Sequence, residues 1–390
     1  MQYKKIIDFI RSLYPGRDFI ALHEPYFAGN EKKYLLDCID TTFVSSVGKY
    51  VDKFEEMVKE YTGTKYAIAT VNGTSALHIA LLLAGVKQDD YVLTQPLTFI
   101  ATCNAISYCG AEPVFFDIDR KTLGMSADSL EKWLTENADV LKSDKGNEDS
   151  KYFAIHKESG RKIRACVPMH TFGHPCEIDR IVEICDRYHI NVVEDSAESL
   201  GSYYKGQHTG TFGKLGILSF NGNKTITTGG GGMILTDDEQ LGKLAKHITT
   251  TAKKPHRWEF NHDIVGYNYR LPNVNAAIGC AQMELLPEIL KNKRETAMKY
   301  KSFFESMEEV EYVSESENSI SNYWLNAVLL NSFEEREAFL ELTNKEKVMT
   351  RPAWTLMNKL PMFNNTPTAD LTMSNDIERR LVNIPSSGRF

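Results

Sequence analysis

Residues 191–198 read Asn-Val-Val-Glu-Asp-Ser-Ala-Glu, and residues 219–232 read Ser-Phe-Asn-Gly-Asn-Lys-Thr-Ile-Thr-Thr-Gly-Gly-Gly-Gly. In the first stretch, two valines form a short apolar strand that ends in the carboxylate of Asp195. Open parallel sheets bind their ligands beyond the carboxyl ends of the strands, so we expect this carboxylate at a ligand-binding edge. The second stretch places Lys224 among small polar residues, where packing gives a lysine little purpose.

Together, Lys224 and Asp195 predict a site for pyridoxal phosphate. An amine must hold the aldehyde of this cofactor as a Schiff base, and a carboxylate must keep its ring nitrogen protonated so that the ring accepts electrons. Glu198, one turn beyond Asp195, is placed to reach the phenolic oxygen of the cofactor. Two alternatives stay open from these stretches alone: a solvated loop lysine for Lys224, and a capping carboxylate for Glu198.

A phosphate site is predicted at residues 72–76, which read Asn-Gly-Thr-Ser-Ala between an apolar run and a helical pattern. Free backbone N–H groups at a helix N-terminus, with the hydroxyls of Thr74 and Ser75, suit a phosphate. Ser219 adds a hydroxyl, and the glycines at 229–232 allow the backbone to approach a ligand closely. An ordinary Ser/Thr helix cap is the alternative. The spacing of a Walker-type loop is absent.

Apolar runs alternate with helical patterns along the chain, which predicts a doubly wound α/β domain with a mainly parallel sheet. We expect strands at 66–71, 91–94, 113–117, 165–169, 191–195, 216–220 and 233–236, and helices at 74–84, 102–109, 179–188, 239–246 and 276–304. The polar residues 137–165 are expected to form a surface excursion, a hairpin without chemistry.

A length of 390 residues favours two domains. We expect a large domain at 25–250 and a smaller one at 251–390, with a helix in residues 1–20 packing near the smaller domain.

Composition excludes several other classes. The net charge of −7 argues against a nucleic-acid surface. No run of eighteen apolar residues suggests a membrane span, and the N-terminal residues lack a signal-peptide cleavage site, so we expect a cytoplasmic protein. The seven cysteines form no CxxC pair and are expected to be free thiols. The ten histidines show no ligand spacing, so no metal site is expected.

In their order and spacing, residues 72–77, 193–201 and 219–233 resemble the DegT/DnrJ/EryC1/StrS family of pyridoxal phosphate-dependent sugar aminotransferases. The resemblance extends over nearly the whole chain. It implies the α/β architecture known as fold type I of pyridoxal phosphate enzymes. That architecture has a large domain with a mainly parallel, seven-stranded sheet and a smaller C-terminal α+β domain.

The resemblance also implies roles for single residues. Lys224 would form the Schiff base, Asp195 would pair with the ring nitrogen, and Glu198 would contact the phenolic oxygen. The residues implied to hold the phosphate are Thr74, Ser75 and Ser219. Phe99 matches the aromatic residue that stacks on the cofactor ring, with a core phenylalanine as the alternative.

Residues 266–270, Gly-Tyr-Asn-Tyr-Arg, match a family motif that reaches into the site of the neighbouring subunit, where Asn268 would contact the phosphate. The resemblance therefore implies a homodimer with two shared active sites. The aromatic and polar composition of residues 252–272 suits a buried contact, although a loop that packs within its own chain is the alternative. His256, Arg257 and Arg270 are candidates for contacts with a sugar or a diphosphate.

The choice of substrate depends on finer features. Gly230 departs from many family members, which have an acidic residue there. The four glycines after Phe-Asn-Gly-Asn-Lys, with Leu-His-Glu-Pro at 22–25 and Phe-Val-Ser-Ser-Val-Gly-Lys at 43–49, resemble a branch that acts on UDP-linked 4-keto-6-deoxy-N-acetylhexosamines. This branch supplies legionaminic acid or bacillosamine pathways. We therefore expect transfer of an amino group from L-glutamate to the C4 ketone of such a sugar.

Other functions are weighed against this one. An aminotransferase for a GDP- or dTDP-linked ketosugar and a non-catalytic relic of the fold are the alternatives, although a relic would be expected to lose Lys224 or Asp195. The sugar dehydratases of the family have a histidine in place of the lysine, so Lys224 argues against them. A nicotinamide-dependent reductase would need GxGxxG after an early strand, where this chain has Asn-Gly-Thr-Ser.

Overall fold

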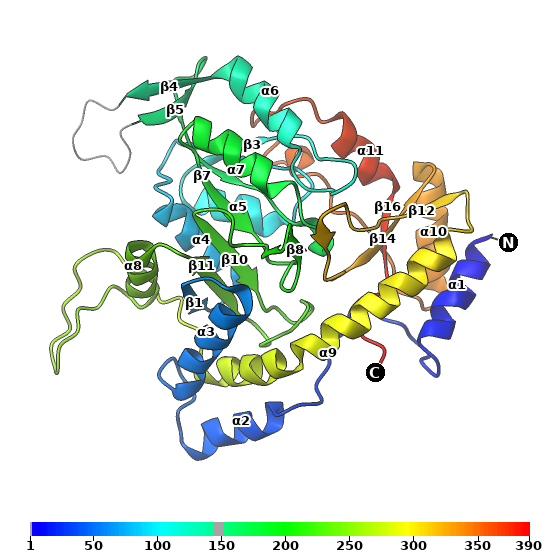
Figure 1. Cartoon of the computed structure of the whole chain (residues 1–390), viewed down its shortest axis with the longest axis horizontal. Helices are drawn as coiled ribbons and strands as arrows, with labels where there is room; N and C mark the ends of the chain where they lie inside the picture. The colour runs from blue at the N-terminus through cyan, green and yellow to red at the C-terminus, as the bar shows by residue number, and fades with distance from the viewer. Residues whose placement is uncertain (1, 143–151) are drawn as a thin grey trace.

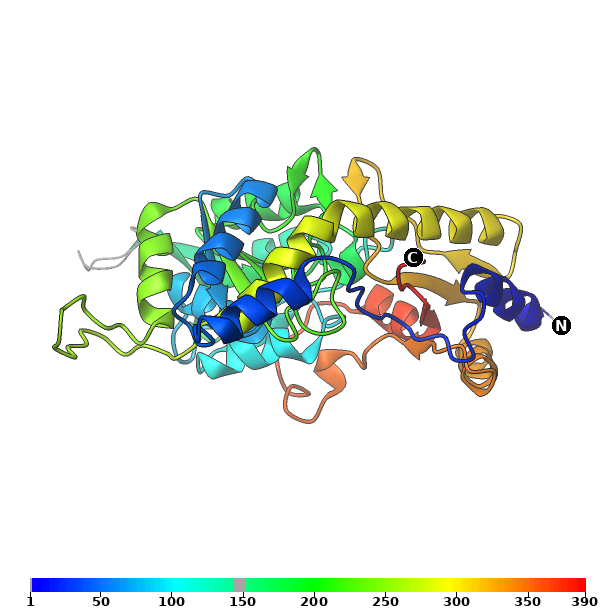
Figure 2. The same cartoon turned by 90° about the horizontal axis from the view of Figure 1, so that it is seen from below.

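The two main sheets of the molecule differ in size and are joined by one long helix (Figures 1 and 2). The computed structural model describes residues 2–142 and 152–390. The long helix, α9 (Asn273–Phe304), runs from the larger sheet to the smaller one, and both chain termini lie on the side of the smaller sheet. The larger sheet holds all the strands that were predicted to carry the site.

The larger sheet has a central path of seven strands, in the order β1 (Tyr66–Thr70), β11 (Gly232–Thr236), β10 (Leu215–Ser219), β7 (Asn191–Asp195), β6 (Lys162–Val167), β2 (Tyr91–Thr94) and β3 (Glu112–Phe115). The run from β10 to β3 is parallel, and only β11 is antiparallel to its two neighbours. The predicted mainly parallel sheet is confirmed.

The polar excursion does form a hairpin, and it widens the sheet. Strand β4 (Ala138–Lys142) pairs with β5 (Tyr152–His156), and β5 pairs with β6, which gives nine strands in all. The rest of the expected excursion, residues 143–151, lies outside the described residues.

Alternation along the strands explains why helices cover both faces of this sheet. In β11, Ile234 packs against the helices of one face, whereas Met233 and Leu235 pack against those of the other. The first face is covered by α4 (Gly73–Leu83), α5 (Ile100–Tyr108) and α8 (Glu239–Thr249), and the second by α3 (Lys49–Thr62), α6 (Ala127–Asn137), α7 (Ile178–Arg187) and the first half of α9. This arrangement is doubly wound, as predicted.

The smaller sheet is antiparallel throughout, in the order β12 (Val310–Tyr312), β14 (Asn326–Leu330), β16 (Leu381–Ile384) and β15 (Arg351–Pro352). Its helices are α10 (Phe333–Lys345), α11 (Thr372–Arg380) and the N-terminal α1 (Gln2–Leu13). Ile6 and Ile10 of α1 share a hydrophobic cluster with Phe339 and Val382, so the N-terminal helix lies near the C-terminal half of the chain. The domain boundary at residue 250 stays a prediction.

The remaining elements are short or lie at the periphery. They are α2 (Glu31–Asp40), two short 3-10 helices (Thr171–Gly173 and Met357–Lys359) and a small sheet of β8 (Tyr203–Tyr204), β9 (Gln207–His208) and β13 (Ser319–Ile320). Helix α6 was not anticipated, and its start is marked by Ser126, whose hydroxyl accepts a hydrogen bond from the N–H of Ser129.

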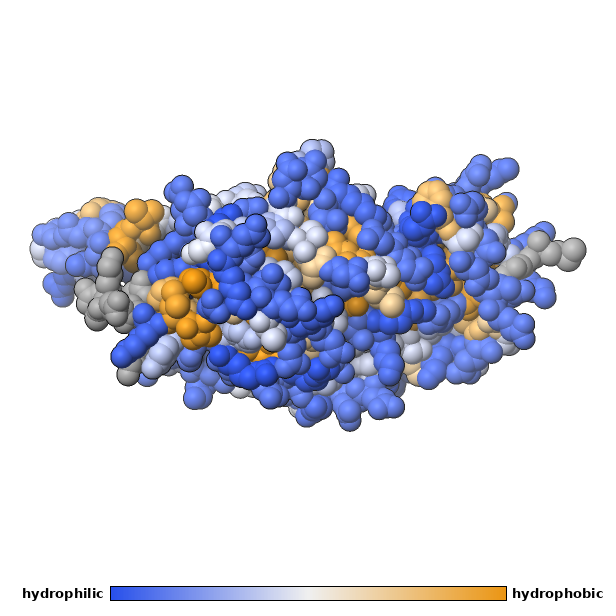
Figure 3. Space-filling model, turned by 90° about the horizontal axis from the view of Figure 1, so that it is seen from above, coloured by the Kyte–Doolittle hydropathy of each residue, from blue (hydrophilic) through white to orange (hydrophobic). Residues whose placement is uncertain are grey.

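The surface shows small separate apolar patches on the face drawn in Figure 3. Within the described ranges, no helix combines the length and apolar character that crossing a membrane requires. All seven cysteines are buried, and none is bonded to another.

Lys293 lies inside the molecule, in the part of α9 between the two sheets. Its side chain is 1% exposed, and its Nζ donates hydrogen bonds to the carbonyl oxygens of Trp324 at 3.1 Å and Ser386 at 2.8 Å. Burial in this neutral environment lowers the pKa of Lys293 from 10.5 to about 7. The amine is therefore mostly neutral in the folded protein above that pH.

This burial predicts a rise in stability with pH. Between about pH 7 and pH 10.5, the unfolded chain binds a proton at residue 293 that the folded chain does not bind, so the free energy of unfolding increases with pH. Chemical denaturation of Lys293→Met at pH 7, 8 and 9 is expected to show a flatter dependence than the wild type. Lys291→Met, at an exposed position of the same helix, should keep the wild-type slope. Equal slopes for all three proteins would show that Lys293 is charged when folded.

Candidate active site

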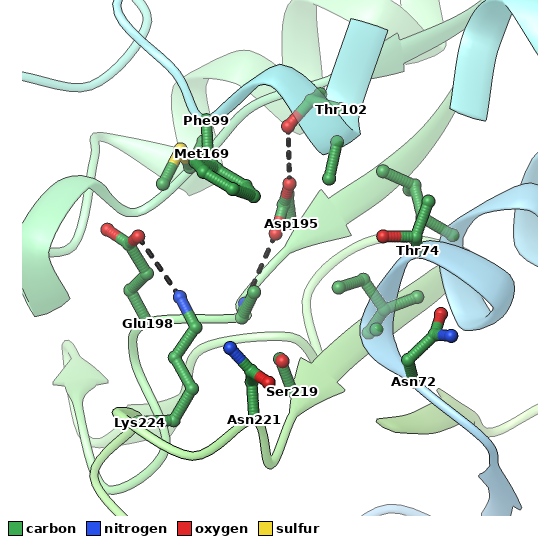
Figure 4. Close-up of a pocket in the computed structure, with 15 residues that line it drawn as sticks. Asn72, Thr74, Phe99, Thr102, Met169, Asp195, Glu198, Ser219, Asn221 and Lys224 are labelled. Carbon is green, nitrogen blue, oxygen red and sulfur yellow. Dashed lines mark hydrogen bonds and ion pairs between the residues drawn. The ribbon is translucent and has the colours of Figure 1, made fainter. Parts of the chain in front are cut away.

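A cavity of about 240 Å³ opens at the carboxyl ends of β7 and β10, beside the N-terminus of α4. It brings together six of the residues singled out in the sequence, which are Thr74, Phe99, Asp195, Glu198, Ser219 and Lys224. In Figure 4, Lys224 and Glu198 lie at one end of the cavity and Thr74 at the other, with Asp195 between them.

Lys224 lies on the turn that follows β10, and its backbone N–H donates to the carbonyl oxygen of Asn221 at 3.0 Å. Its Nζ lies 3.2 Å from Oε1 of Glu198 and 4.1 Å from the ring centroid of Trp324. The side chain is only 12% exposed. Lys224 is therefore directed into the cavity and is not a solvated loop lysine.

Glu198 is buried beside Lys224. Its Oε2 accepts a hydrogen bond from the N–H of Phe172 at 2.9 Å, while its Oε1 faces the Lys224 amine. Burial raises the pKa of Glu198 to about 7, with a further rise from the charge of Asp195 and an opposing effect from Lys224 and the Phe172 N–H. A carboxyl group with this pKa exchanges its proton readily near neutrality.

Asp195, the last residue of β7, is 5% exposed and has only neutral hydrogen-bond donors. Its Oδ2 accepts from the hydroxyl of Thr102 at 2.7 Å, and its Oδ1 accepts from the N–H of Ala197 at 3.2 Å. In the part of the chain that the structure describes, no cation lies within ion-pair distance of it. A buried carboxylate without a cation is costly, so the site suits a ligand that brings a protonated nitrogen.

The far end of the cavity suits a phosphate. Asn72 caps α4 by accepting the N–H of Ser75 at 2.7 Å, which leaves Thr74 in the first turn facing the cavity. Ser219, at the end of β10, lies across from it. Ser75 is buried but is not among the residues that line the cavity, so its phosphate contact stays a prediction.

Phe99 precedes α5 and lines the cavity with about half of its surface exposed (49%). Its ring meets that of Trp354 edge-on, with 6.3 Å between the centroids. The position does not suit a core phenylalanine, because a core side chain would be covered on all sides.

The loop that follows α8 carries the other predicted residues and projects from the large sheet (Figure 1). His256 and Arg257 are exposed there, and Asn268 accepts hydrogen bonds from Nε and Nη2 of Arg270 at 3.0 and 2.9 Å. None of the four lines the cavity of its own chain. Their predicted roles in a second subunit stay predictions.

Comparison with known proteins decides the family. The model of the DegT/DnrJ/EryC1/StrS aminotransferase family matches residues 25–390. This chain belongs to that family. DegT/DnrJ/EryC1/StrS aminotransferases depend on pyridoxal phosphate, and the arrangement of an amine, a buried carboxylate without a cation and a hydroxyl-lined helix start fits this cofactor.

Relatives in the DegT/DnrJ/EryC1/StrS family extend over almost the same length. The GDP-perosamine synthase of Escherichia coli O157:H7 is 37% identical over 94% of this chain and 93% of its own. Among solved structures, Helicobacter pylori PseC, an aminotransferase involved in the biosynthesis of pseudoaminic acid, has a TM-score of 0.82 at 23% identity and covers 94% of this chain and 93% of its own. Streptococcus pneumoniae Spr1654, in its PMP form, has a TM-score of 0.81 at 22% identity, with 94% and 92% covered. These structures share the fold.

Gly73, at the end of the cavity where the phosphate is predicted to bind, offers a test. An added Cβ at Gly73 would lie 2.9 Å from Cβ and 3.1 Å from Oγ of Ser219. Overpacking of this kind costs about 1–3 kcal/mol, so Gly73→Ala is expected to weaken pyridoxal phosphate binding about tenfold. Titration of the apoprotein measures the affinity. Gly230→Ala, whose Cβ would meet only the carbonyl oxygen of Val71 at 3.9 Å, should bind as the wild type does. If Gly73→Ala binds pyridoxal phosphate with unchanged affinity, the phosphate does not bind beside Gly73.

Sequence reasoning missed several residues that contribute to the site. Thr102 contributes through its hydrogen bond to Asp195, and its hydroxyl lies 2.8 Å from that of Thr98, four residues earlier in the chain. Met169, at the end of a predicted strand, lines the cavity. Trp324 had no signal, because it reaches Lys224 from a hundred residues further along the chain.

Proposed function

We propose that this aminotransferase transfers the amino group of L-glutamate to the C4 ketone of a UDP-linked 4-keto-6-deoxy-N-acetylhexosamine. The product would be a UDP-4-amino-4,6-dideoxy-N-acetylhexosamine for surface glycans of the legionaminic acid or bacillosamine type. The observation that carries the proposal is the cavity in which the Lys224 amine, Glu198 and Asp195 converge. The choice of sugar rests on the sequences at 22–25 and 43–49.

Bound pyridoxal phosphate supplies a carbonyl group that takes up the amino group of one substrate and gives it to the next, and a ring that spreads an electron pair. Asp195 would hold the proton on the ring nitrogen, with Thr102 fixing the orientation of the carboxylate. Phe99 would cover the ring face and exclude water. The phosphate would be anchored by Thr74, Ser75 and Ser219.

Lys224 would serve as the proton carrier. When its amine is free, it is placed to remove a proton from the α-carbon of glutamate and to deliver one to C4 of the sugar. Glu198 lies 3.2 Å from this amine and would contact the phenolic oxygen, so it links the lysine and the ring. The Lys224 amine and the Glu198 carboxylate are shielded from bulk water, which strengthens their mutual attraction.

A homodimer would complete the site. Asn268 of one chain would contact the phosphate held by the other, and His256, Arg257 and Arg270 would face the sugar or its diphosphate. The support is the exposure of this loop: Trp258 and Phe260 are 71% and 77% exposed, which is unusual for large aromatic side chains in a monomer.

A GDP-linked ketosugar is the second candidate. Three relatives that are 33–39% identical to this chain are GDP-perosamine synthases, from Escherichia coli O157:H7, Vibrio cholerae and Caulobacter vibrioides. The same residues would carry out the amino transfer on either nucleotide sugar, so the two candidates differ only in recognition of the acceptor.

A panel of acceptor sugars distinguishes the UDP-linked candidate from the GDP-linked one. The purified protein, loaded with pyridoxal phosphate, is incubated with ¹⁵N-glutamate and, in turn, a UDP-linked 4-keto-6-deoxy-N-acetylhexosamine, a GDP-linked 4-keto-6-deoxyhexose and a dTDP-linked counterpart. Mass spectrometry should detect ¹⁵N in the UDP-sugar with the highest kcat/KM. A higher kcat/KM with the GDP-sugar would replace the proposed substrate with the second candidate.

A further inference from the structure

The segment just before β14 reaches across from the second half of the chain to the residues around Lys224. Asn322, 3% exposed, donates hydrogen bonds from Nδ2 to the carbonyl oxygens of Glu198 and Leu200, each at 2.9 Å, and to the hydroxyl of Thr225 at 3.1 Å. Thr225 follows Lys224 directly in the chain. The side-chain amide of Asn322 therefore links the segment that carries Lys224 to the segment that carries Glu198.

Trp324 is fixed within this segment on three sides. Its backbone N–H donates to Oδ1 of Asn322 at 2.8 Å, and its carbonyl oxygen accepts from the buried Lys293 at 3.1 Å. Its indole Nε1–H donates to the carbonyl oxygen of Asn223 at 2.6 Å. With only 4% of its surface exposed, the indole has little freedom to move.

The indole ring contacts the Lys224 amine directly. Nζ lies 4.1 Å from the ring centroid, within the range of a cation–π interaction, which is strongest for tryptophan and gains strength when water is excluded. Glu198 contacts the same amine at 3.2 Å. The free amine therefore rests between a carboxylate and an aromatic face.

These two partners act differently on the amine. A carboxylate exchanges protons with an amine, whereas an indole face attracts an ammonium group and has no lone pair that accepts its proton. Trp324 therefore restricts the position of the amine without competing for its proton. Such restriction matters for a group that must leave the cofactor, act as a proton carrier and return.

We propose that Trp324 is a positioning residue for Lys224, which holds the free amine at the Glu198 end of the cavity between its proton-transfer steps. The inference rests on the role of Lys224 in the proposed function. It goes beyond that role by assigning a task to a residue of the second half of the same chain, whose ring centroid lies 4.1 Å from Nζ of Lys224.

The test compares two substitutions at this position. Trp324→Phe keeps an aromatic face and loses the hydrogen bond to Asn223, whereas Trp324→Leu loses both. The matched control is Trp133→Leu, which removes a buried indole (9% exposed) that packs on Phe116 and His156, outside the cavity. The measurements are the rate at which the apoprotein reacts with pyridoxal phosphate, the kcat and KM for glutamate, and the melting temperature.

We expect Trp324→Leu to slow both the reaction of the apoprotein with pyridoxal phosphate and kcat by about 10-fold to 100-fold, as for other small misplacements of catalytic groups, with KM for glutamate unchanged. Trp324→Phe should restore both rates to within about threefold of the wild type. Trp133→Leu should lower the melting temperature as Trp324→Leu does, with both rates within about twofold of the wild type.

Two outcomes would overturn the inference. Wild-type rates in Trp324→Leu would show that the indole has no task at the amine. Equal losses in Trp324→Leu and Trp133→Leu would assign Trp324 to packing alone. A wild-type protein that binds pyridoxal phosphate without a covalent link to Lys224 would instead refute the proposed function, and it is recognised before any variant is compared.

Discussion

Lys224→Ala is expected to bind pyridoxal phosphate without the visible absorption band of a lysine-linked cofactor, and to lose kcat for amino transfer by about 10⁴-fold or more. The substitution removes both the covalent anchor of the cofactor and the proton carrier. Because Lys224 is the one lysine that lines the described cavity, no neighbouring amine is placed to replace it. Absorbance spectra and the rate of product formation from glutamate and a ketosugar measure the two losses.

The control for this variant is Lys205→Ala. Lys205 is an exposed lysine paired with Asp179, outside the cavity, and its removal should leave the spectrum and the rate as they are. A normal band in Lys224→Ala would show that another lysine holds the cofactor, which would contradict the site as built.

Asp195→Asn is expected to lower kcat by about 10³-fold, equal to about 4 kcal/mol of transition-state stabilisation. Asparagine has nearly the same shape and can still accept a hydrogen bond from Thr102, but it has no charge to keep a ring nitrogen protonated. Binding of pyridoxal phosphate should be weakened much less than kcat, because the hydroxyl groups predicted to hold the phosphate are untouched. Stopped-flow absorbance with glutamate alone, then with the ketosugar, measures each half of the reaction.

Both half-reactions, with glutamate and with the ketosugar, should slow in Asp195→Asn, because each needs the protonated ring. Asp186→Asn, at an exposed position of α7, controls for the loss of one negative charge. If Asp195→Asn loses affinity for the cofactor but keeps the wild-type kcat, the carboxylate of Asp195 contributes to binding only and not to catalysis.

The parts of the site that were predictable are those whose signal lies within a few residues. Asp195 is marked by the valines before it, Thr74 by the glycine and serine around it, and Lys224 by a polar turn without apolar periodicity. Strand β7, which ends at Asp195, and strand β10, which precedes Lys224, were equally clear, because both lie in the interior of the sheet, where apolar runs are nearly continuous.

The rest depends on contacts between distant segments. Trp324 contacts Lys224, and Asn322 contacts its neighbour Thr225, through the packing of a loop from the other half of the chain, and no local pattern marks these contacts. Helix α6 was missed although it buries Ala127, Leu130, Trp133 and Leu134 at helical spacing. The loop that carries Asn268 and Arg257 is outside the cavity of its own chain, so its predicted contact with a second subunit stays a prediction.

Reduction of the protein loaded with pyridoxal phosphate by borohydride, followed by peptide mapping, tests the central claim most directly. Borohydride fixes the cofactor to the lysine that holds it. We predict one phosphopyridoxyl group per chain, on the peptide that contains Lys224, and its loss when glutamate is added before the reductant. A group on any other lysine, or a labelled Lys224 that glutamate does not protect, would contradict the account.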